Sequence, residues 1–172
     1  MAIDTSIVGK TTSRTVVAVE RAPVAAFARA VKDDNPIYQD ERAAKAAGFD
    51  SIPAPPIWPF VMSFSGSYPD LQEGVEPVAS NPMYELMDKL REKGGIILHG
   101  EQEFIYHQPG RPVLAGDVLY GEATVTNAYE KESKGPNGKG RVMTFIVTET
   151  VWKDRATGEP VVTSIFNLIH RA

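Results

Sequence analysis

The sequence predicts an α+β fold in which an antiparallel sheet wraps around a helix. In the first half of the chain, apolar residues recur at helical spacing, whereas from residue 96 onward they alternate with a period of two. Two segments rich in turn-forming residues, 134–138 and 154–158, separate runs of Val, Thr, Ile and aromatic residues. One strand, then several helices, then a meander of strands is an α+β arrangement.

The helical half is punctuated by capping and breaking residues. The helix that begins near Pro23 must stop before Asn35, because the residue that precedes a proline is pushed out of helical geometry. Asp40 is suited to cap the next helix, and Gly48 to end it. The expected elements are a strand over 15–20 and helices over 23–32, 41–47, 57–64 and 83–93, with 57–64 as a buried helix.

The second half is expected to form the rest of the sheet. The predicted strands cover 96–107, about 117–130, 141–153 and 160–170. Strict alternation places His99 and His107 on one face of the first of these strands, at ~26 Å from each other, so the two cannot chelate one metal ion. Residues 66–96 are interpreted as a helical insertion that either covers a groove or adds to an interface.

Composition excludes several classes of function. The chain has 172 residues, expected to form a single domain, and its net charge of −4 has no basic stripe for nucleic acid. No apolar run is long enough to span a membrane, and the first residues do not resemble a signal peptide, so a cytoplasmic protein is expected. There is no cysteine for thiolate chemistry, and three histidines remain for acid–base work. One of them, His170, is expected to be exposed.

Two stretches carry a family resemblance. The first runs from Phe27 through Asp33-Asp34-Asn35-Pro36-Ile37-Tyr38-Gln39-Asp40 to Gly48-Phe49 and Ile52-Pro53-Ala54-Pro55-Pro56. It resembles the hydratase motif of MaoC-like enoyl-thioester hydratases. The second, Leu98-His99-Gly100 through Pro109 and then Ala115-Gly116-Asp117-Val118, is similar to the strand and turn of the N-terminal or fatty-acid-synthase-type dehydratase branch. The resemblance implies a hotdog fold, a curved antiparallel sheet around a central helix.

The resemblance also implies a chemistry. In the family, an Asp and a His on one loop hold water and move a proton next to an acyl thioester, and a backbone amide at the start of the central helix stabilises the enolate oxygen. Asp33 and Asn35 match the loop, but Tyr38 occupies the histidine position and Val31-Lys32 replaces a small residue and glycine. Tyrosine has an ordinary pKa of ~10 and is a poor base near neutral pH. Pro55-Pro56 stands in place of His-Gly.

Three hypotheses follow from this degenerate motif. The chain is the acyl-CoA- or acyl-ACP-binding subunit of an (R)-specific enoyl-thioester hydratase or 3-hydroxyacyl dehydratase, and needs a second, histidine-bearing MaoC-like hotdog chain. Alternatively, it is a self-sufficient homodimeric hydratase that uses Asp33 with Tyr38 or His99. A third reading is a binding or regulatory module without turnover. None of them requires a cofactor or a metal.

Each candidate site residue also has a structural interpretation. Asp33 and Asn35 suit an Asx turn at the end of a helix, and Tyr38 suits a packing role. The residues expected to contact substrate are Pro55, Pro56, Ile57, Trp58 and Phe60, although core packing is the default interpretation of such an apolar run. His99 beside Glu101 is the alternative base, or else a structural histidine.

Overall fold

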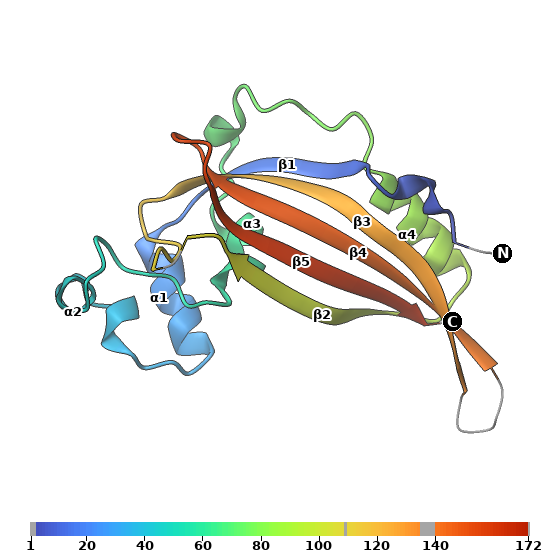
Figure 1. Cartoon of the computed structure of the whole chain (residues 1–172), viewed down its shortest axis with the longest axis horizontal. Helices are drawn as coiled ribbons and strands as arrows, with labels where there is room; N and C mark the ends of the chain where they lie inside the picture. Colours follow the sequence, from blue (N-terminus) through green and yellow to red (C-terminus); the bar gives the residue numbers. More distant parts are fainter. Residues whose placement is uncertain (1–2, 109, 135–139, 172) are drawn as a thin grey trace.

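An antiparallel sheet of five strands dominates the structure (Figure 1), a computed structural model that describes residues 3–108, 110–134 and 140–171. The strand order is β1-β3-β4-β5-β2. The strands are β1 (Thr11–Ala18), β2 (Ile96–Tyr106), β3 (Val118–Lys134), β4 (Gly140–Asp154) and β5 (Pro160–Arg171). The predicted α+β class is confirmed, and β1 begins four residues earlier than the alternation suggested. The hairpin signal at 134–138 joins β3 and β4, but residues 135–139 lie outside the described part of the chain.

The helices are short. They are α1 (Arg21–Ala30), α2 (Glu41–Ala46), α3 (Met62–Ser65) and α4 (Pro82–Glu92), with 3-10 turns at Thr5–Ile7, Pro36–Tyr38, Trp58–Phe60 and Pro69–Gln72. The single helix expected over 57–64 is split into a 3-10 turn and α3. Pro59 contributes no N–H to a helical ladder, and Val61 between the two pieces departs from helical geometry, with φ −107° and ψ −1°.

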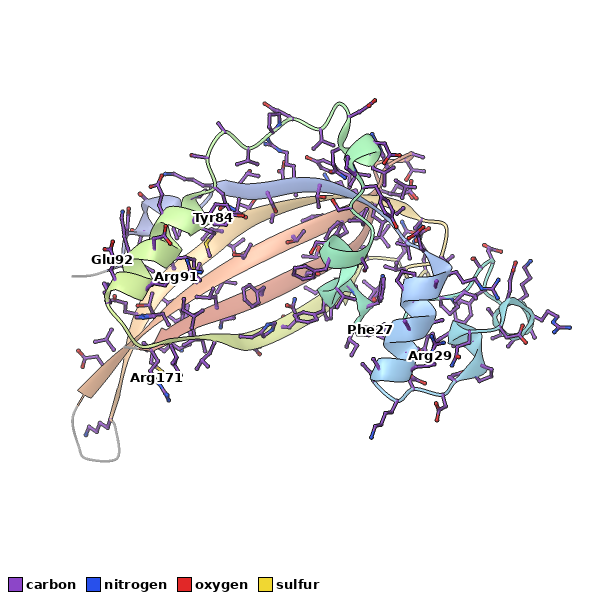
Figure 2. The ribbon with its side chains drawn as sticks, turned by 180° about the vertical axis from the view of Figure 1, so that it is seen from behind. Phe27, Arg29, Tyr84, Arg91, Glu92 and Arg171 are labelled. Carbon is purple, nitrogen blue, oxygen red and sulfur yellow. The ribbon has the colours of Figure 1, made fainter. Side chains whose placement is uncertain are left out.

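Helices α3 and α4 cover the same face of the sheet at opposite ends (Figures 1 and 2). Near α3, the buried side chains of Trp58 and Met62 belong to a core cluster with Trp152 of β4. Near α4, Leu86 and Leu90 pack into a second cluster with residues of β3, β4 and β5. The middle of this face lies between the two clusters, and the cluster residues of the described helices do not extend over it.

A β-bulge in β2 changes which side chains reach the covered face. The pairing with β5 shifts between His99 and Glu101, so His99 lies opposite Leu168 while Gln102 lies opposite Phe166. The bulge puts His99 on the covered face, whereas His107 hydrogen-bonds Thr163 on the other face at 2.7 Å. The expectation that both histidines share one face was therefore wrong. A side chain at Gly100 would lie 2.5 Å from Ile169 Cδ1, so glycine at the bulge avoids displacement of the Ile169 side chain.

The segment 66–72 covers the outer edge of β1. The side-chain amide of Gln72 accepts a hydrogen bond from Val16 N at 3.0 Å and donates one to Val16 O at 2.8 Å. It thereby pairs with the strand as a neighbouring backbone would. Ala18 N donates to Gly66 O at 2.9 Å, and the Tyr68 hydroxyl donates to the carboxylate of Glu20. The insertion predicted at 66–96 thus covers a sheet edge with this segment and a sheet face with α4.

His170 is buried, not exposed as expected. Its side chain is 2% accessible, and Nε2 lies 2.7 Å from the carbonyl oxygen of Gly94. The pairing of β5 with β2 and β4 carries the strand through residue 171, so His170 faces α4 and not solvent.

No helix in the described ranges is long and apolar enough to cross a membrane.

Helix α1 ends in a left-handed residue that is not glycine. Lys32 has φ 59°, its N–H donates to Arg29 O at 3.1 Å, and Asp33 N donates to Ala28 O at 2.9 Å. This paired arrangement is a Schellman cap, which favours glycine because a Cβ is strained at positive φ. Lys32 therefore stands, in place of the motif's glycine, at a position whose conformation favours glycine.

Replacing Lys32 by glycine is expected to stabilise the fold by about 1 kcal/mol, because it removes the strain of a left-handed lysine without loss of a backbone hydrogen bond. Urea unfolding followed by circular dichroism measures the change. Lys32→Ala is the matched control: it removes the charge but keeps the Cβ, and its stability should stay near that of the unchanged chain. Equal stabilisation in both variants would contradict the explanation.

Candidate functional site

The loop after α1 holds the family's two polar residues in local hydrogen bonds. Asp33 Oδ1 accepts from Asn35 N at 3.1 Å, and Asn35 Oδ1 accepts from Ile37 N at 3.2 Å. Asn35 is thereby the N-cap of the 3-10 turn Pro36–Tyr38. These bonds shape the loop and bring Tyr38 inward.

Tyr38 is a buried phenol in the position of the expected base. Its pKa is raised, first by burial and then by the negative charge of Asp33. Tyr106 at the end of β2 has its pKa raised to about 12, mainly by burial and further by Tyr38. Both tyrosines therefore stay protonated at neutral pH and can donate a hydrogen bond, but cannot remove a proton.

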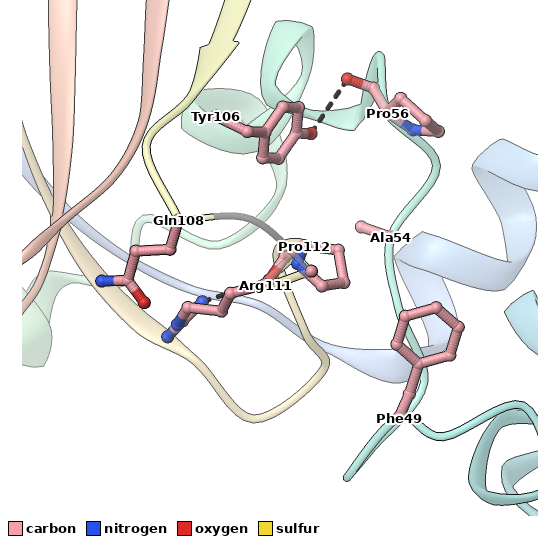
Figure 3. Close-up of a pocket in the computed structure, with 8 residues that line it drawn as sticks. Phe49, Ala54, Pro56, Tyr106, Gln108, Arg111 and Pro112 are labelled. Carbon is pink, nitrogen blue, oxygen red and sulfur yellow. Dashed lines mark hydrogen bonds between the residues drawn. The ribbon is translucent and has the colours of Figure 1, made fainter.

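A cavity of about 310 Å³ opens beside Tyr106 (Figure 3). We call it the Tyr106 cavity. The Tyr106 hydroxyl donates to the carbonyl oxygen of Pro56 at 2.9 Å, which ties the end of β2 to the proline segment. The lining residues are Phe49, Ala54, Pro56, Tyr106, Gln108, Gly110, Arg111 and Pro112. Their surface is mainly apolar, and Arg111 is the cation among them.

The proline segment leaves few backbone donors at this cavity. Residues 53, 55, 56 and 59 are prolines, which have no N–H. The amide of Ala54 donates to Val113 O at 2.7 Å, and that of Trp58 donates to Pro55 O at 2.8 Å. Pro56 stands where the resemblance places a glycine after the family's histidine. The chain cannot offer a backbone donor from that position.

Arg111 holds the turn that closes the cavity. Its guanidinium donates to both oxygens of Asp117, at 3.1 and 3.3 Å, and to Asp154 Oδ2 at 3.3 Å. Asp117 also accepts from Leu114 N at 2.8 Å. Backbone N–H groups of Thr157 and Ala156, with Arg111, hold the pKa of Asp154 below its usual range. Arg111 thus links the Gly116-Asp117 turn before β3 to the end of β4 through ion pairs.

A second cavity, of about 370 Å³, lies on the covered face of the sheet. We call it the sheet-face cavity. The His99 ring lies edge-on to Phe60 and Phe166, with centroids 5.3 and 4.7 Å away. The lining residues are Pro59, Phe60, Ser63, Phe64, His99, Gln102, Thr150, Trp152, Ser164 and Phe166. These side chains come from α3 and the turn before it and from β2, β4 and β5.

The sheet-face cavity begins at His99, near the start of β2, and extends along the sheet to Trp152, which lies in the same row as Tyr106 because both pair with Val162. Seven residues separate His99 from Tyr106, which is about 20 Å along a strand. Tyr38 acts electrostatically on Tyr106 and Asp33 on Tyr38, so this group lies at the Tyr106 end. His99 therefore does not join Asp33 and Tyr38 in one site. Within the described ranges, no three His, Asp or Glu side chains are placed to hold a metal ion.

The residues expected to bind substrate are divided between several environments. Pro56 lines the Tyr106 cavity and Phe60 the sheet-face cavity. Trp58 is buried against Phe27, with ring centroids 5.4 Å apart, and Ile57 is half exposed. Pro55 is buried. Their role in binding substrate remains a prediction.

Sequence reasoning missed the residues that come from distant segments. Nothing in the sequence links Tyr106 to Pro56, which is 50 residues away. Trp152 and Ser164 belong to strands whose pairing brings them together. The hydrogen bonds of Arg111 depend on the same long-range pairing.

A curved antiparallel sheet with short helices on one face, and an Asp–Asn loop beside one end of the sheet, defines a MaoC-like hotdog domain. A family model described as "FAS1-like, dehydratase domain region" matches residues 6–164. The chain therefore belongs to the FAS1-like dehydratase domain family. A UPF0336 protein of Streptomyces avermitilis is 36% identical over 100% of this chain and 97% of its own length, and one of Saccharopolyspora erythraea is 31% identical over 99% and 93%.

Solved structures confirm the hotdog fold. A crystal structure of the C-terminally truncated HadBC complex, a (3R)-hydroxyacyl-ACP dehydratase of Mycobacterium tuberculosis, includes a chain that is 27% identical, with a TM-score of 0.64. The match covers 97% of this chain and 99% of that one. The (R)-hydratase of A. caviae is 19% identical, with a TM-score of 0.56 over 94% of both chains.

Replacing Asp154 by Asn is expected to lower the free energy of unfolding by about 1 kcal/mol at pH 7, because it removes the charge held by Arg111 and the turn amides. The pKa of Asp154 is depressed in the folded chain, so this stabilisation is complete above the unfolded pKa of ~4 and is lost as the pH falls through the folded pKa. Urea unfolding at pH 7 and pH 3 measures it. If the variant and the unchanged chain differ in free energy of unfolding by as much at pH 3 as at pH 7, the stabilisation does not come from the charge of Asp154.

Proposed function

We propose that this chain is the acyl-thioester-binding subunit of an (R)-specific enoyl-thioester hydratase or 3-hydroxyacyl dehydratase, and that a second, histidine-bearing hotdog chain supplies catalysis. One observation carries the proposal. The loop has its hydrogen-bonded conformation, but a buried, protonated Tyr38 occupies the position of the base. The substrate would be an acyl-CoA or acyl-ACP, and the setting the cytoplasm.

Two separate deficits support a subunit that is not catalytic by itself. Tyr38 cannot take a proton at neutral pH, for the reasons of burial and charge given above. Pro56 cannot donate a backbone hydrogen bond to a developing enolate oxygen. Loss of a base and loss of an oxyanion donor each cost orders of magnitude in rate, so repair of one would leave the other.

The sheet offers one edge to a partner. Strand β2 pairs with β5, and among the described strands it has no neighbour on its other side. Ile96, Leu98 and Ile105 of this strand are each about 40% accessible, so apolar surface follows the free edge. The edge at β1 is covered by Gln72. A second hotdog chain added at β2 would extend the sheet and approach both cavities.

The chain is 27% identical to a chain of HadBC, which is a complex, and this likeness supports a heteromeric assembly. The likeness to (R)-hydratases, at 18–19% identity, supports the fold alone.

Hydration assays with crotonyl-CoA and longer enoyl-CoA thioesters test the proposal. The purified chain is expected to show no turnover alone and to gain activity when it is mixed with the product of a neighbouring MaoC-like gene. Activity of the chain alone that disappears in Asp33→Ala would favour a self-sufficient hydratase. Thioester binding without turnover in either sample would favour a binding module.

Restoring both missing groups is expected to create activity in the chain alone. Tyr38→His supplies a base, and Pro56→Gly supplies a backbone N–H shortly before the Trp58–Phe60 turn, where this proposal places the oxyanion donor. The double variant should hydrate enoyl-CoA at least about 100-fold faster than either single variant, because one oxyanion donor contributes about 10²–10³ in rate. Stopped assays with chiral product analysis measure it.

Asp33→Asn in the double variant is the control, and it should abolish the gained activity while the fold, followed by circular dichroism, is retained. Equal activity of Tyr38→His alone and of the double variant would contradict the role given to Pro56.

A further inference from the structure

Two buried hydrogen-bonding atoms in the wall of the sheet-face cavity lack a protein partner. Four buried side-chain atoms have no hydrogen-bond partner within the described residues: Trp58 Nε1, Trp152 Nε1, Ser164 Oγ and Asn167 Oδ1. Of these, Trp152 and Ser164 belong to residues that line the sheet-face cavity. Their side chains are 4% and 8% accessible. Buried polar groups in proteins are nearly always hydrogen-bonded, so an unsatisfied pair in one cavity wall needs an explanation.

The two residues are close neighbours on the covered face. Trp152 pairs with Val162 across β4 and β5, and Thr150 pairs with Ser164, so Trp152 and Ser164 are diagonal neighbours on one face. The indole lies over Gly121 of β3, where a side-chain carbon would meet Trp152 Cζ3 at 2.5 Å.

The surroundings of this pair are otherwise suited to an acyl chain. Phe60, Phe64 and Phe166 contribute apolar surface to the cavity, and Phe64 is 83% accessible at its rim. Thr150 and Gln102 add further polar side chains to the same wall. Gln102 Nε2 donates to Ile165 O at 3.0 Å. A plain alkyl chain here would leave the indole N–H and the serine hydroxyl unsatisfied.

We propose that the sheet-face cavity selects acyl groups that carry an oxygen substituent, a keto or hydroxyl group along the chain, which accepts a hydrogen bond from Trp152 Nε1 and exchanges one with Ser164 Oγ. This inference rests on the proposed thioester-binding function and adds the substrate class to it. It makes Trp152 and Ser164 specificity-determining residues, separate from the loop of Asp33 and Tyr38.

The indole N–H gives a direct readout, because the chain has two tryptophans and hence two indole signals in a proton–nitrogen NMR spectrum. The full-length chain is titrated with dodecanoyl-CoA, with mid-chain keto- and hydroxydodecanoyl-CoA isomers, and with the corresponding free fatty acids. Loss of one signal in Trp152→Phe and of the other in Trp58→Phe assigns the two indoles.

The oxygenated chains are expected to bind about five- to tenfold more tightly than the plain chain, as one hydrogen bond to a buried donor allows. They should move the Trp152 indole proton downfield and leave that of Trp58 in place. Trp152→Phe and Ser164→Ala should each remove most of this preference. Ser65→Ala is the matched variant: Ser65 is on α3 but is not among the residues that line the cavity, its hydroxyl donates to Val61 O at 3.0 Å, and the preference should persist.

The outcomes separate this inference from the proposed function. If free oxygenated acids show the preference and no thioester binds, the thioester function is wrong and the selectivity of the cavity stands. If thioesters bind with equal affinity whether oxygenated or plain, or if the preference survives both Trp152→Phe and Ser164→Ala, the selectivity is overturned and the thioester function stands. Absence of binding in every titration overturns both.

Discussion

The structure depends on how the apolar face of one curved sheet is removed from water. A single long helix would cover such a face from end to end, but this chain uses two short segments, with Trp58 and Met62 at one end and Leu86 and Leu90 at the other. Each buried side chain of this size contributes about 1.5–3 kcal/mol, so both ends are firmly anchored. The middle of the face is left to the sheet-face cavity. The division of the covering layer is thus what makes room for a ligand on the sheet.

The conformation and the chemistry of the loop after α1 are separable. Lys32 keeps the left-handed geometry that glycine would provide more easily, and Asp33 and Asn35 keep the local hydrogen bonds. The group that changes is Tyr38, whose side chain points inward and is neutral. The loop thus keeps a strained, hydrogen-bonded conformation while a neutral phenol occupies the position that the resemblance gives to the base.

Much of the fold could be predicted from the sequence because it depends on local patterns. The alternation after residue 96 and the turn residues at 154–158 produce strands close to those expected, and α2 begins after its Asp40 cap. The failures are long-range in origin. The bulge at Gly100 appears only when β2 is paired with β5, and it moves His99 to the other face. His170 is buried because α4 packs over its strand, which no local pattern indicates. For the same reason the loop residues could be found from their spacing, whereas Tyr106, Trp152 and Ser164 required the assembled sheet.

The amide of Gln72 has a consequence for how large an assembly can grow. A sheet with two free edges can add strands at both sides and continue without limit, as fibres do. Here the side chain occupies the hydrogen-bonding groups of Val16, and Gly66 O accepts from Ala18 N, so strand addition is blocked at this end of the β1 edge. A chain that joins at β2 therefore meets a molecule whose other edge is partly occupied. If the incoming chain carries the same closure, the product is a finite pair with its hydrogen-bonded junction in the middle.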